Sequence, residues 1–238
     1  MRRSLLCAGV LALLAVLAMP SSSFAQQSVN FYLGGFVPRS VDARDQDDVL
    51  LNNLDVFNFD LGAFKGVTFG GEWLVGVSRF AEVGLGVGYY SQTVPSAYWD
   101  YGNTDGSDIQ QDLALRMVPF TATVRWLPLG RQGGFVPYLG AGVGIIQFRY
   151  SESGDFVDFN DCARDRSCAL FNDTFTGSGA ATGPLFLGGA RFPVGPVGIG
   201  GELRYQHAKG DLPASEDFAG PKIDLGGFSY LVTVNVRF

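Results

Sequence analysis

The chain ends in Tyr230-Leu-Val-Thr-Val-Asn-Val-Arg-Phe238, and this stretch decides the fold. Successive side chains of a β-strand point to opposite faces, so one face of this segment carries only apolar side chains. We expect that face to hold Tyr230, Val232, Val234, Val236 and Phe238. A soluble protein seldom ends on a strand with one wholly apolar face. The segment therefore predicts a strand that closes a barrel and turns this face toward lipid.

The N-terminus has the features of a cleavable signal peptide. A basic Arg2-Arg3 pair precedes an apolar run over 5–19, and Ser23-Phe24-Ala25 has the small residues of a cleavage site. The alternative is a permanent membrane anchor, but the run is shorter than the ~20 residues that a spanning helix needs. We therefore expect a signal peptide over 1–25 and one barrel domain over 26–238.

The composition indicates an acidic all-β protein. Removal of the signal peptide takes away two arginines and no acid, so the net charge moves from −6 to −8. No basic patch remains for nucleic acid, and we expect no nucleic-acid partner. The chain has 33 glycines, 20 phenylalanines and 9 tyrosines, without helical periodicity. This combination is typical of an all-β barrel.

Eight segments alternate with a period of two residues, which predicts eight β-strands. Their spans are 28–37, 67–78, 82–91, 112–126, 135–149, 183–192, 196–207 and 224–238. Long connections (38–66, 92–111, 150–182, 208–223) alternate with short ones (79–81, 127–134, 193–195). Bacterial outer-membrane barrels have this alternation, with short periplasmic turns and longer extracellular loops. The predicted fold is an all-β, eight-stranded antiparallel up-and-down transmembrane β-barrel, with both termini periplasmic.

The rival fold is a soluble barrel with an apolar interior, such as a lipocalin. Over 82–91, Val83, Leu85, Val87 and Tyr89 alternate with Glu82 and three glycines. A lipocalin would turn that second set toward water, and glycines without lysines make a poor solvent-facing surface. Inside a narrow membrane barrel the same glycines leave room for larger neighbours. The pattern favours the membrane barrel.

Two predicted strands change phase. Over 112–126, the apolar set passes from Leu113, Leu115 and Met117 to residues of the opposite parity, beginning at Phe120. The change lies beside Pro119, which cannot donate to a ladder, so we expect a β-bulge there. Over 135–149 a similar change occurs. It indicates either a second bulge or the point where the strand leaves the membrane.

The polar parity of the strands carries the candidate functional residues. We expect Glu72, Glu82, Arg125, Glu202, Arg204 and Arg237 to point into the barrel. Paired carboxylates are able to do acid–base chemistry. An eight-stranded barrel, however, is only wide enough for its own side chains, and buried charges must pair. We therefore predict a structural polar network that plugs the lumen.

The predicted long connections are acidic, with eighteen acidic residues against seven basic ones. Such loops are able to hold Ca²⁺ or to bridge lipopolysaccharide through divalent cations. No segment matches an ordered calcium loop, so ordinary solvated loops are favoured, and we expect no metal and no cofactor. Cys162 and Cys168 are the only cysteines of the mature chain. In an oxidising periplasm a disulfide between them is expected, with two free thiols as the alternative.

Little in the sequence favours an enzyme. His207 is the one histidine, and Lys209 occupies the position two residues later where outer-membrane lipid A deacylases have a serine. The glycine-rich run 140–144 lacks the G-x-G-x-x-G spacing and a following helix, so it is not a dinucleotide loop. We expect no catalytic residues.

Three stretches carry a family resemblance: Pro137-Tyr-Leu-Gly-Ala-Gly-Val-Gly144, Gly201-Glu-Leu-Arg-Tyr205 and Val234-Asn-Val-Arg-Phe238. With them, the chain resembles the superfamily of small eight-stranded outer-membrane barrels, which includes outer membrane proteins X and W and the transmembrane domain of outer membrane protein A. The resemblance covers approximately 28–238.

The resemblance implies a monomeric integral protein of the Gram-negative outer membrane. Its partners would be outer-membrane lipids and lipopolysaccharide, with periplasmic chaperones and the insertion machinery during assembly. That machinery would read the aromatic last residue. The resemblance implies a structural or surface-interaction role. The alternatives are a narrow conduit for small hydrophobic molecules and, ranked last, a lipid A-modifying enzyme.

Overall fold

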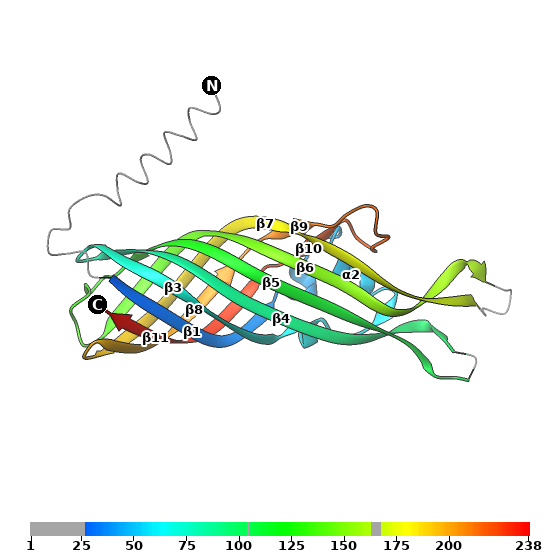
Figure 1. Ribbon diagram of the computed structural model, residues 1–238, viewed down its shortest axis with the longest axis horizontal. Helices are drawn as coiled ribbons and strands as arrows, with labels where there is room; N and C mark the ends of the chain where they lie inside the picture. The colour runs from blue at the N-terminus through cyan, green and yellow to red at the C-terminus, as the bar shows by residue number, and fades with distance from the viewer. Residues whose placement is uncertain (1–26, 104, 163–167) are drawn as a thin grey trace, which may run out of the picture.

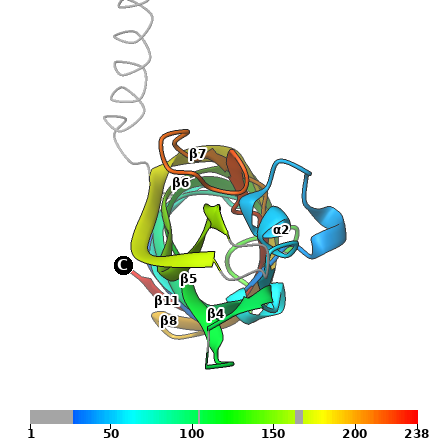
Figure 2. The ribbon, with the colours of Figure 1, turned by 90° about the vertical axis from the view of Figure 1, so that its right-hand side faces the viewer.

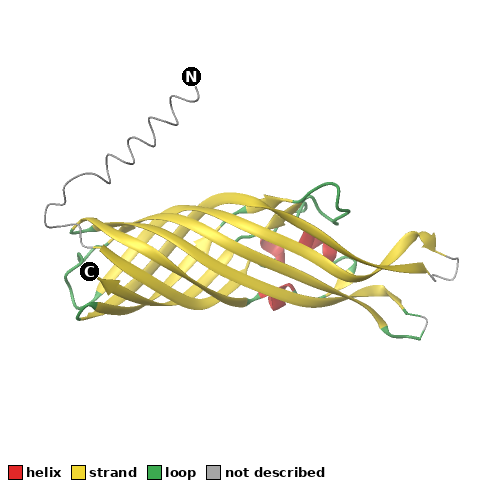
Figure 3. Cartoon of the chain, viewed as in Figure 1, coloured by secondary structure: helices red, strands yellow, loops and turns green. Residues whose placement is uncertain are grey.

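The computed structural model describes residues 27–103, 105–162 and 168–238, which form a closed barrel of long tilted strands (Figure 1). The predicted signal peptide, 1–25, lies outside the described residues. Strands make up the wall, and the short helices lie toward one end (Figure 3). Within the described ranges, no helix has both the length and the apolar character to cross a membrane.

Eight antiparallel strands form the wall. In ring order they are β1 (Gln27–Pro38), β3 (Gly66–Ser78), β4 (Ala81–Gly102), β5 (Asp108–Trp126), β6 (Val136–Cys162), β7 (Cys168–Val194), β8 (Val197–Gln206) and β11 (Gly227–Arg237). β11 pairs with β1 from Ser28↔Arg237 to Pro38↔Gly227 and thereby closes the ring. The eight-stranded antiparallel barrel predicted from the sequence is confirmed.

The two ends of the barrel differ. The short turns after β3, β5 and β7 lie together at the end that carries the C-terminus, which we call the turn end (Figure 1). The opposite end, the loop end, carries the smaller elements, and Figure 2 shows α2 at its rim. These elements are η1 (Val41–Ala43), α2 (Val49–Asn53), β2 (Phe57–Asn58), η2 (Leu61–Phe64), β9 (Lys209–Asp211) and β10 (Lys222–Asp224).

Two of the predicted long loops are wrong. The segments 92–111 and 150–182 are mostly strand, because β4, β5, β6 and β7 continue far beyond their predicted ends. β6 and β7 stay paired from Val136↔Arg191 to Asp158↔Ala169. The two hairpins therefore project beyond the rest of the barrel at the loop end (Figure 1).

An apolar band surrounds the turn-end half of the barrel. Leu85, Val124 and Leu139 are 60%, 59% and 59% exposed on its outer face. The outward residues of β11 and the C-terminal residue after it belong to the same band: Tyr230, Val232, Val234, Val236 and Phe238 are 59%, 63%, 40%, 37% and 70% exposed. An outer face of this kind is suited to hydrocarbon and not to water.

The expected bulge beside Pro119 is wrong. The pairing of β5 with β6 runs without a shift from Gln111↔Gly154 to Trp126↔Leu139. On the other side, β4 and β5 keep one register from Ala81↔Trp126 to Ala97↔Gln110, although the two pairs between Val87↔Phe120 and Tyr90↔Met117 are missing. Proline has no backbone N–H, so it leaves a gap in the ladder without adding a residue.

The phase change has a different cause. Leu113, Leu115 and Met117 point inward and are buried, whereas Phe120 on the opposite parity is 44% exposed. β6 behaves in the same way, with Ile145 outside and Phe148 buried. The strands therefore leave the apolar band at this level. Beyond it most outward residues are polar and apolar residues fill the interior, although a few apolar side chains, such as Trp99 and Phe159, stay exposed on the hairpins.

An apolar core closes the loop-end half of the barrel. Val49, Leu50 and Phe64, from the segment between β1 and β3, are fully buried, and Ile223 of β10 joins them. They pack against inward side chains of the projecting strands, including Leu113. The four shorter strands of the wall, β1, β3, β8 and β11, end before they reach this core. The inserted segments therefore complete the wall there.

Candidate functional site

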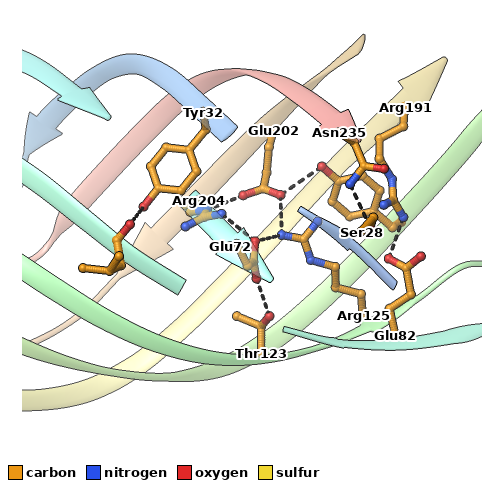
Figure 4. Close-up of polar contacts among 12 residues, drawn as sticks. Ser28, Tyr32, Glu72, Glu82, Thr123, Arg125, Arg191, Glu202, Arg204 and Asn235 are labelled. Atoms are coloured by element: carbon orange, nitrogen blue, oxygen red, sulfur yellow. Dashed lines mark hydrogen bonds and ion pairs between the residues drawn. The ribbon is translucent and has the colours of Figure 1, made fainter. Parts of the chain in front are cut away.

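Four charged side chains meet in the middle of the lumen, and we call them the central cluster: Glu72 of β3, Arg125 of β5, and Glu202 and Arg204 of β8 (Figure 4). Arg125 forms ion pairs with both glutamates, and its Nη2 lies 3.0 Å from Glu202 Oε2. Arg204 likewise pairs with both, and its Nη2 lies 3.1 Å from Glu72 Oε2. Two positive and two negative charges thus balance.

Neutral side chains add to the coordination of the cluster, although Arg125 Nε and Nη1 are buried without a hydrogen-bond partner among the described residues. Thr123 Oγ1 donates to Glu72 Oε1 over 2.7 Å, and the Tyr138 hydroxyl donates to Glu202 Oε2 over 2.9 Å. The guanidinium groups of Arg125 and Arg204 stack on Tyr138 and Tyr32, at 4.7 and 4.4 Å from the ring centroids. Aromatic faces attract cations, so these rings hold the arginines in place.

Glycines make room for the two tyrosines, as the sequence predicts. A Cβ on Gly88 would lie 2.6 Å from the Tyr32 hydroxyl oxygen, and a Cβ on Gly189 would lie equally close to that of Tyr138. Real Cβ contacts are never so short, so larger residues at these positions would displace the rings.

A second group of charges, the turn-end cluster, lies toward the short turns. Glu82 accepts from Arg191 over 2.6 Å and from Arg131 over 3.2 Å. Arg191 also lies over the Tyr138 ring, with its Cζ 5.2 Å from the ring centroid. Tyr138 therefore connects the two clusters into one column of charged and aromatic groups.

The sequence-based set and the observed set overlap in part. Glu72, Arg125, Glu202 and Arg204 come together, and Glu82 lies in the second cluster. Arg237 makes no ion pair within 4 Å among the residues that the structure describes. The sequence-based set does not include Arg191 in the polar network. Its neighbour Phe192 is an apolar residue on the outer face, and the alternation of the strand therefore places Arg191 on the inner face. Arg131 lies in the turn between β5 and β6, where no alternation of residues indicates the direction of its side chain.

The clusters close the lumen. The side chains of Glu72, Arg125 and Glu202 have no exposed surface. On the loop side of Arg204, a cavity of about 30 Å³ lies between Tyr32, Tyr90 and Met117. A cavity of that size holds a water molecule or two but no organic solute.

Buried ion pairs also fix the inserted segments at the loop end. Asp48 caps α2 by accepting from the Leu51 N–H over 3.0 Å, and it pairs with Arg44 over 2.9 Å. Arg39 pairs with Asp224 of β10 over 2.8 Å. Burial raises the pKa of Asp48 from its ordinary value, although Arg44 and the donated hydrogen bonds oppose this shift.

A cleft of about 560 Å³ opens at the mouth, between the inserted segment and the β6–β7 hairpin. Its lining is rich in aromatic residues, among them Phe57, Tyr98 and Phe156, and includes the carboxyl of Glu152. Asn53 donates to Glu152 Oε1 over 2.6 Å, and the Tyr150 hydroxyl does so over 2.8 Å. Burial raises the pKa of Glu152, against the effect of these hydrogen bonds.

The remaining sequence candidates lie at the loop end. Cys162 and Cys168 face each other across the β6–β7 hairpin and form a disulfide. His207 Nδ1 lies 3.0 Å from Arg39 Nη1, so its described polar neighbour is an arginine and not a serine. The described residues contain no group of three or more histidine, cysteine or acidic side chains that is able to hold a metal ion.

Comparisons with known proteins agree with this geometry at the level of fold. No protein-family model and no curated protein sequence matches the chain. Among solved structures, the outer membrane protein OprG from Pseudomonas aeruginosa is similar, with 13% identity, a TM-score of 0.50, and coverage of 90% of this chain and 97% of OprG.

Two further structures are similar at lower TM-scores. The outer membrane protease OmpT from Escherichia coli has 10% identity and a TM-score of 0.47, with 93% of this chain and 99% of OmpT covered. Neisserial surface protein A has 15% identity and a TM-score of 0.44, with 91% and 98% covered. Together with the closed ring and the apolar band, the similarity to OprG shows that the chain has the fold of the small outer-membrane β-barrels.

Proposed function

We propose that this protein is an integral, non-enzymatic barrel of the bacterial outer membrane, with a structural or surface-interaction role. One observation carries the proposal: buried ion pairs fill the lumen at the level of the apolar band. A barrel that passed polar solutes would need a hydrated path there. The specific work of this protein is therefore assigned to its outer surfaces.

The orientation follows from the lengths of the connections. In outer-membrane barrels the short turns face the periplasm and the longer segments face outward. We therefore assign the turn end and both termini of the barrel to the periplasm, and the loop end to the cell exterior. The projecting hairpins then stand above the outer leaflet.

The loop end is built to present a fixed surface. Its core is apolar, and a disulfide ties the end of the β6–β7 hairpin. Exposed apolar side chains gather on the projecting hairpins: Trp99, Phe159, Leu170 and Phe171 are 59%, 55%, 41% and 41% exposed. Exposed apolar groups on a rigid, otherwise acidic surface are typical of protein interaction sites.

Conductance in planar bilayers tests the sealed lumen. The mature protein is expected to give currents near background, and steady single-channel currents of porin size would overturn the proposal. The charge-neutral pair Arg125→Ala/Glu202→Ala removes the centre of the seal and is expected to produce a measurable leak. Arg79→Ala is the matched control, because Arg79 is exposed at the turn end.

A conduit for small hydrophobic molecules is the second candidate, and two features favour it. The interior above the central cluster is apolar, and the β4–β5 ladder lacks two pairs beside Pro119. A molecule that entered the mouth would need to leave through that gap. Swelling of liposomes with apolar and polar solutes tests this route, and faster uptake of apolar solutes only would favour the conduit.

The absence of enzymatic activity is part of the proposal. It rests on the inaccessibility of the paired glutamates and on the arginine neighbour of His207. Mass spectra of lipid A from cells with and without the protein are expected to be identical. A mass difference that depends on His207 would refute this assignment.

A further inference from the structure

Four side chains with hydrogen-bond donors form a row across the outer face of four neighbouring strands. In register they are Ser91 of β4, Arg116 of β5, Arg149 of β6 and Ser178 of β7, and we call them the donor row. All four are exposed. Adjacent strands are ~4.8 Å apart, so the row is about 14 Å wide.

The two arginines at the centre of the row are directly opposed. Like charges in register on neighbouring strands destabilise a sheet. Neither Arg116 nor Arg149 forms an ion pair or hydrogen bond among the described residues. Glu216 lies beyond β7 and instead accepts from the Thr176 N–H over 3.2 Å. The arrangement therefore lacks a counter-ion of its own.

The neighbouring rows do not supply one. Toward the turn end, the outward residues are Tyr89, Val118, Gln147 and Ala180, and toward the loop end they are Thr93, Ala114, Ser151 and Thr176. None carries a negative charge. In a chain whose mature net charge is −8, two adjacent unpaired arginines are an exception.

The height of the donor row matches a lipid headgroup. Val118 is the last large apolar residue on the outer face of β5, and Arg116 follows two positions beyond it. Two residues span ~7 Å along a strand, and with a tilt of about 40° the rise along the membrane normal is roughly 5 Å. The headgroup layer of a bilayer is about 5–8 Å thick on each side.

The surface is also hollowed at this place. A groove of about 650 Å³ is lined by Arg116, Gln147 and Arg149 on one side and by the small residues 178–180 of β7 on the other. Most of the lining residues lie on the outer face of the barrel, and the inward side chain of Phe148 contributes as well.

We propose that the donor row binds a phosphate group of lipopolysaccharide in the outer leaflet, with both guanidinium groups donating to it. Guanidinium groups match phosphate oxygens in geometry and charge, and the flanking hydroxyls add two donors. The bound phosphate supplies the missing counter-ion. The inference rests on the proposed outer-membrane location, because only that leaflet presents a phosphorylated glycolipid at this height.

Binding of lipid A to the folded protein in bicelles tests the proposal. Bisphosphorylated lipid A is expected to bind, and the dephosphorylated form to bind at least tenfold more weakly. Arg116→Gln and Arg149→Gln are each expected to weaken binding about tenfold or more, because each removes a charge-assisted hydrogen bond. Arg79→Gln loses the same charge at the turn end and is expected to bind like the unmodified protein.

Thermal unfolding separates lipid binding from a purely structural role. In a zwitterionic detergent, Arg149→Gln is expected to unfold at the same or a higher temperature, since it relieves the repulsion. With bisphosphorylated lipid A present it is expected to unfold at a lower temperature than the unmodified protein. A lower unfolding temperature in both media would overturn the proposal.

Further binding experiments identify which molecule supplies the phosphate group that the donor row binds. Protection by millimolar inorganic phosphate equal to that by lipid A, or tighter binding of a sulfated polysaccharide, would overturn the assignment to a lipid. Failure of the unmodified protein to give a heat-modifiable band in bilayers would refute the proposed membrane function and this site with it. A heat-modifiable protein without phosphate preference would overturn the donor row alone.

Discussion

Replacement of Arg125 by methionine tests the central cluster most directly. The arginine side chain is fully buried and pairs with two glutamates whose side chains are also fully buried. Methionine keeps an unbranched side chain of similar length but leaves Glu72 and Glu202 with Arg204 alone. Removal of one partner from a buried ion pair typically costs about 3–5 kcal/mol. Against a typical unfolding free energy of about 5–15 kcal/mol, the loss is large.

A second substitution measures how much of this loss in unfolding free energy comes from the unbalanced negative charge. Glu72→Gln in the Arg125→Met background removes the excess negative charge, and the amide is able to turn its oxygen to Arg204 and its NH₂ group to Thr123 Oγ1. We expect the double variant to be about 2–3 kcal/mol more stable than the sum of the single changes, which is within the range of couplings between contacting residues.

Guanidinium titrations of the mature protein in lipid vesicles, followed by tryptophan fluorescence, measure these free energies. Conditions are chosen so that folding and unfolding curves coincide. Arg79→Gln is the control and is expected to change stability by less than about 1 kcal/mol, since Arg79 is exposed and lies over the Phe80 ring. A loss below ~1 kcal/mol for Arg125→Met, or strictly additive changes in the double variant, would refute the reasoning.

Three further predictions concern the wall and the loop end. Pro119→Thr restores a backbone donor to the β4–β5 ladder and is expected to slow apolar uptake in liposomes if the conduit exists, while polar uptake stays at background. Burial raises the pKa of Glu152, so its contribution to stability is complete below the ordinary value of 4.5 and is lost as the pH rises through the folded value. In Glu152→Gln, the hydrogen-exchange protection factors of α2, which are corrected for the intrinsic pH dependence of exchange, are expected to exceed those of the unmodified protein at neutral pH and not to change with pH. Cys162→Ser/Cys168→Ser removes a bridge with a sequence separation of 6, is expected to cost about 2 kcal/mol locally, and is checked by faster proteolysis of the hairpin end at an unchanged global unfolding midpoint.

The strands of the apolar band were predictable because one physical rule applies to all of them. Lipid outside and a narrow interior give strict alternation, as in Val83 to Tyr89 opposite Glu82 and its glycines. The inward direction of Glu72, Arg125 and Glu202 follows from the same parity. Their mutual contacts do not, because the tilt and stagger of the closed barrel decide which residues reach the same level.

The projecting hairpins were not predictable by that rule. Alternation shows which residues share a face and does not show whether that face meets lipid or the interior. At Met117 and Phe148 the apolar parity changes while the backbone register stays constant. Where the surroundings of the barrel change from lipid to water, the apolar residues move from the outer to the inner face of the strand. In the sequence this change has the same pattern as a β-bulge with one inserted residue. The segments 92–111 and 150–182 therefore lie outside the alternating pattern that predicts the membrane strands, although they are mostly strand.

This inversion fixes the register of the long strands from both sides. A slip of one residue turns every side chain of a strand to the opposite face. In β5, such a slip would move Arg125 into the apolar band, where a charged group facing lipid costs about 2–4 kcal/mol near the membrane centre. The same slip would expose Leu113 to water and bury Arg116 in the apolar core. A one-residue slip is thus unfavourable in the turn-end half and in the loop-end half of the barrel. The lumen charges and the loop-end core together specify one alignment of β4 to β7. They do so although ion pairs alone contribute little net stability.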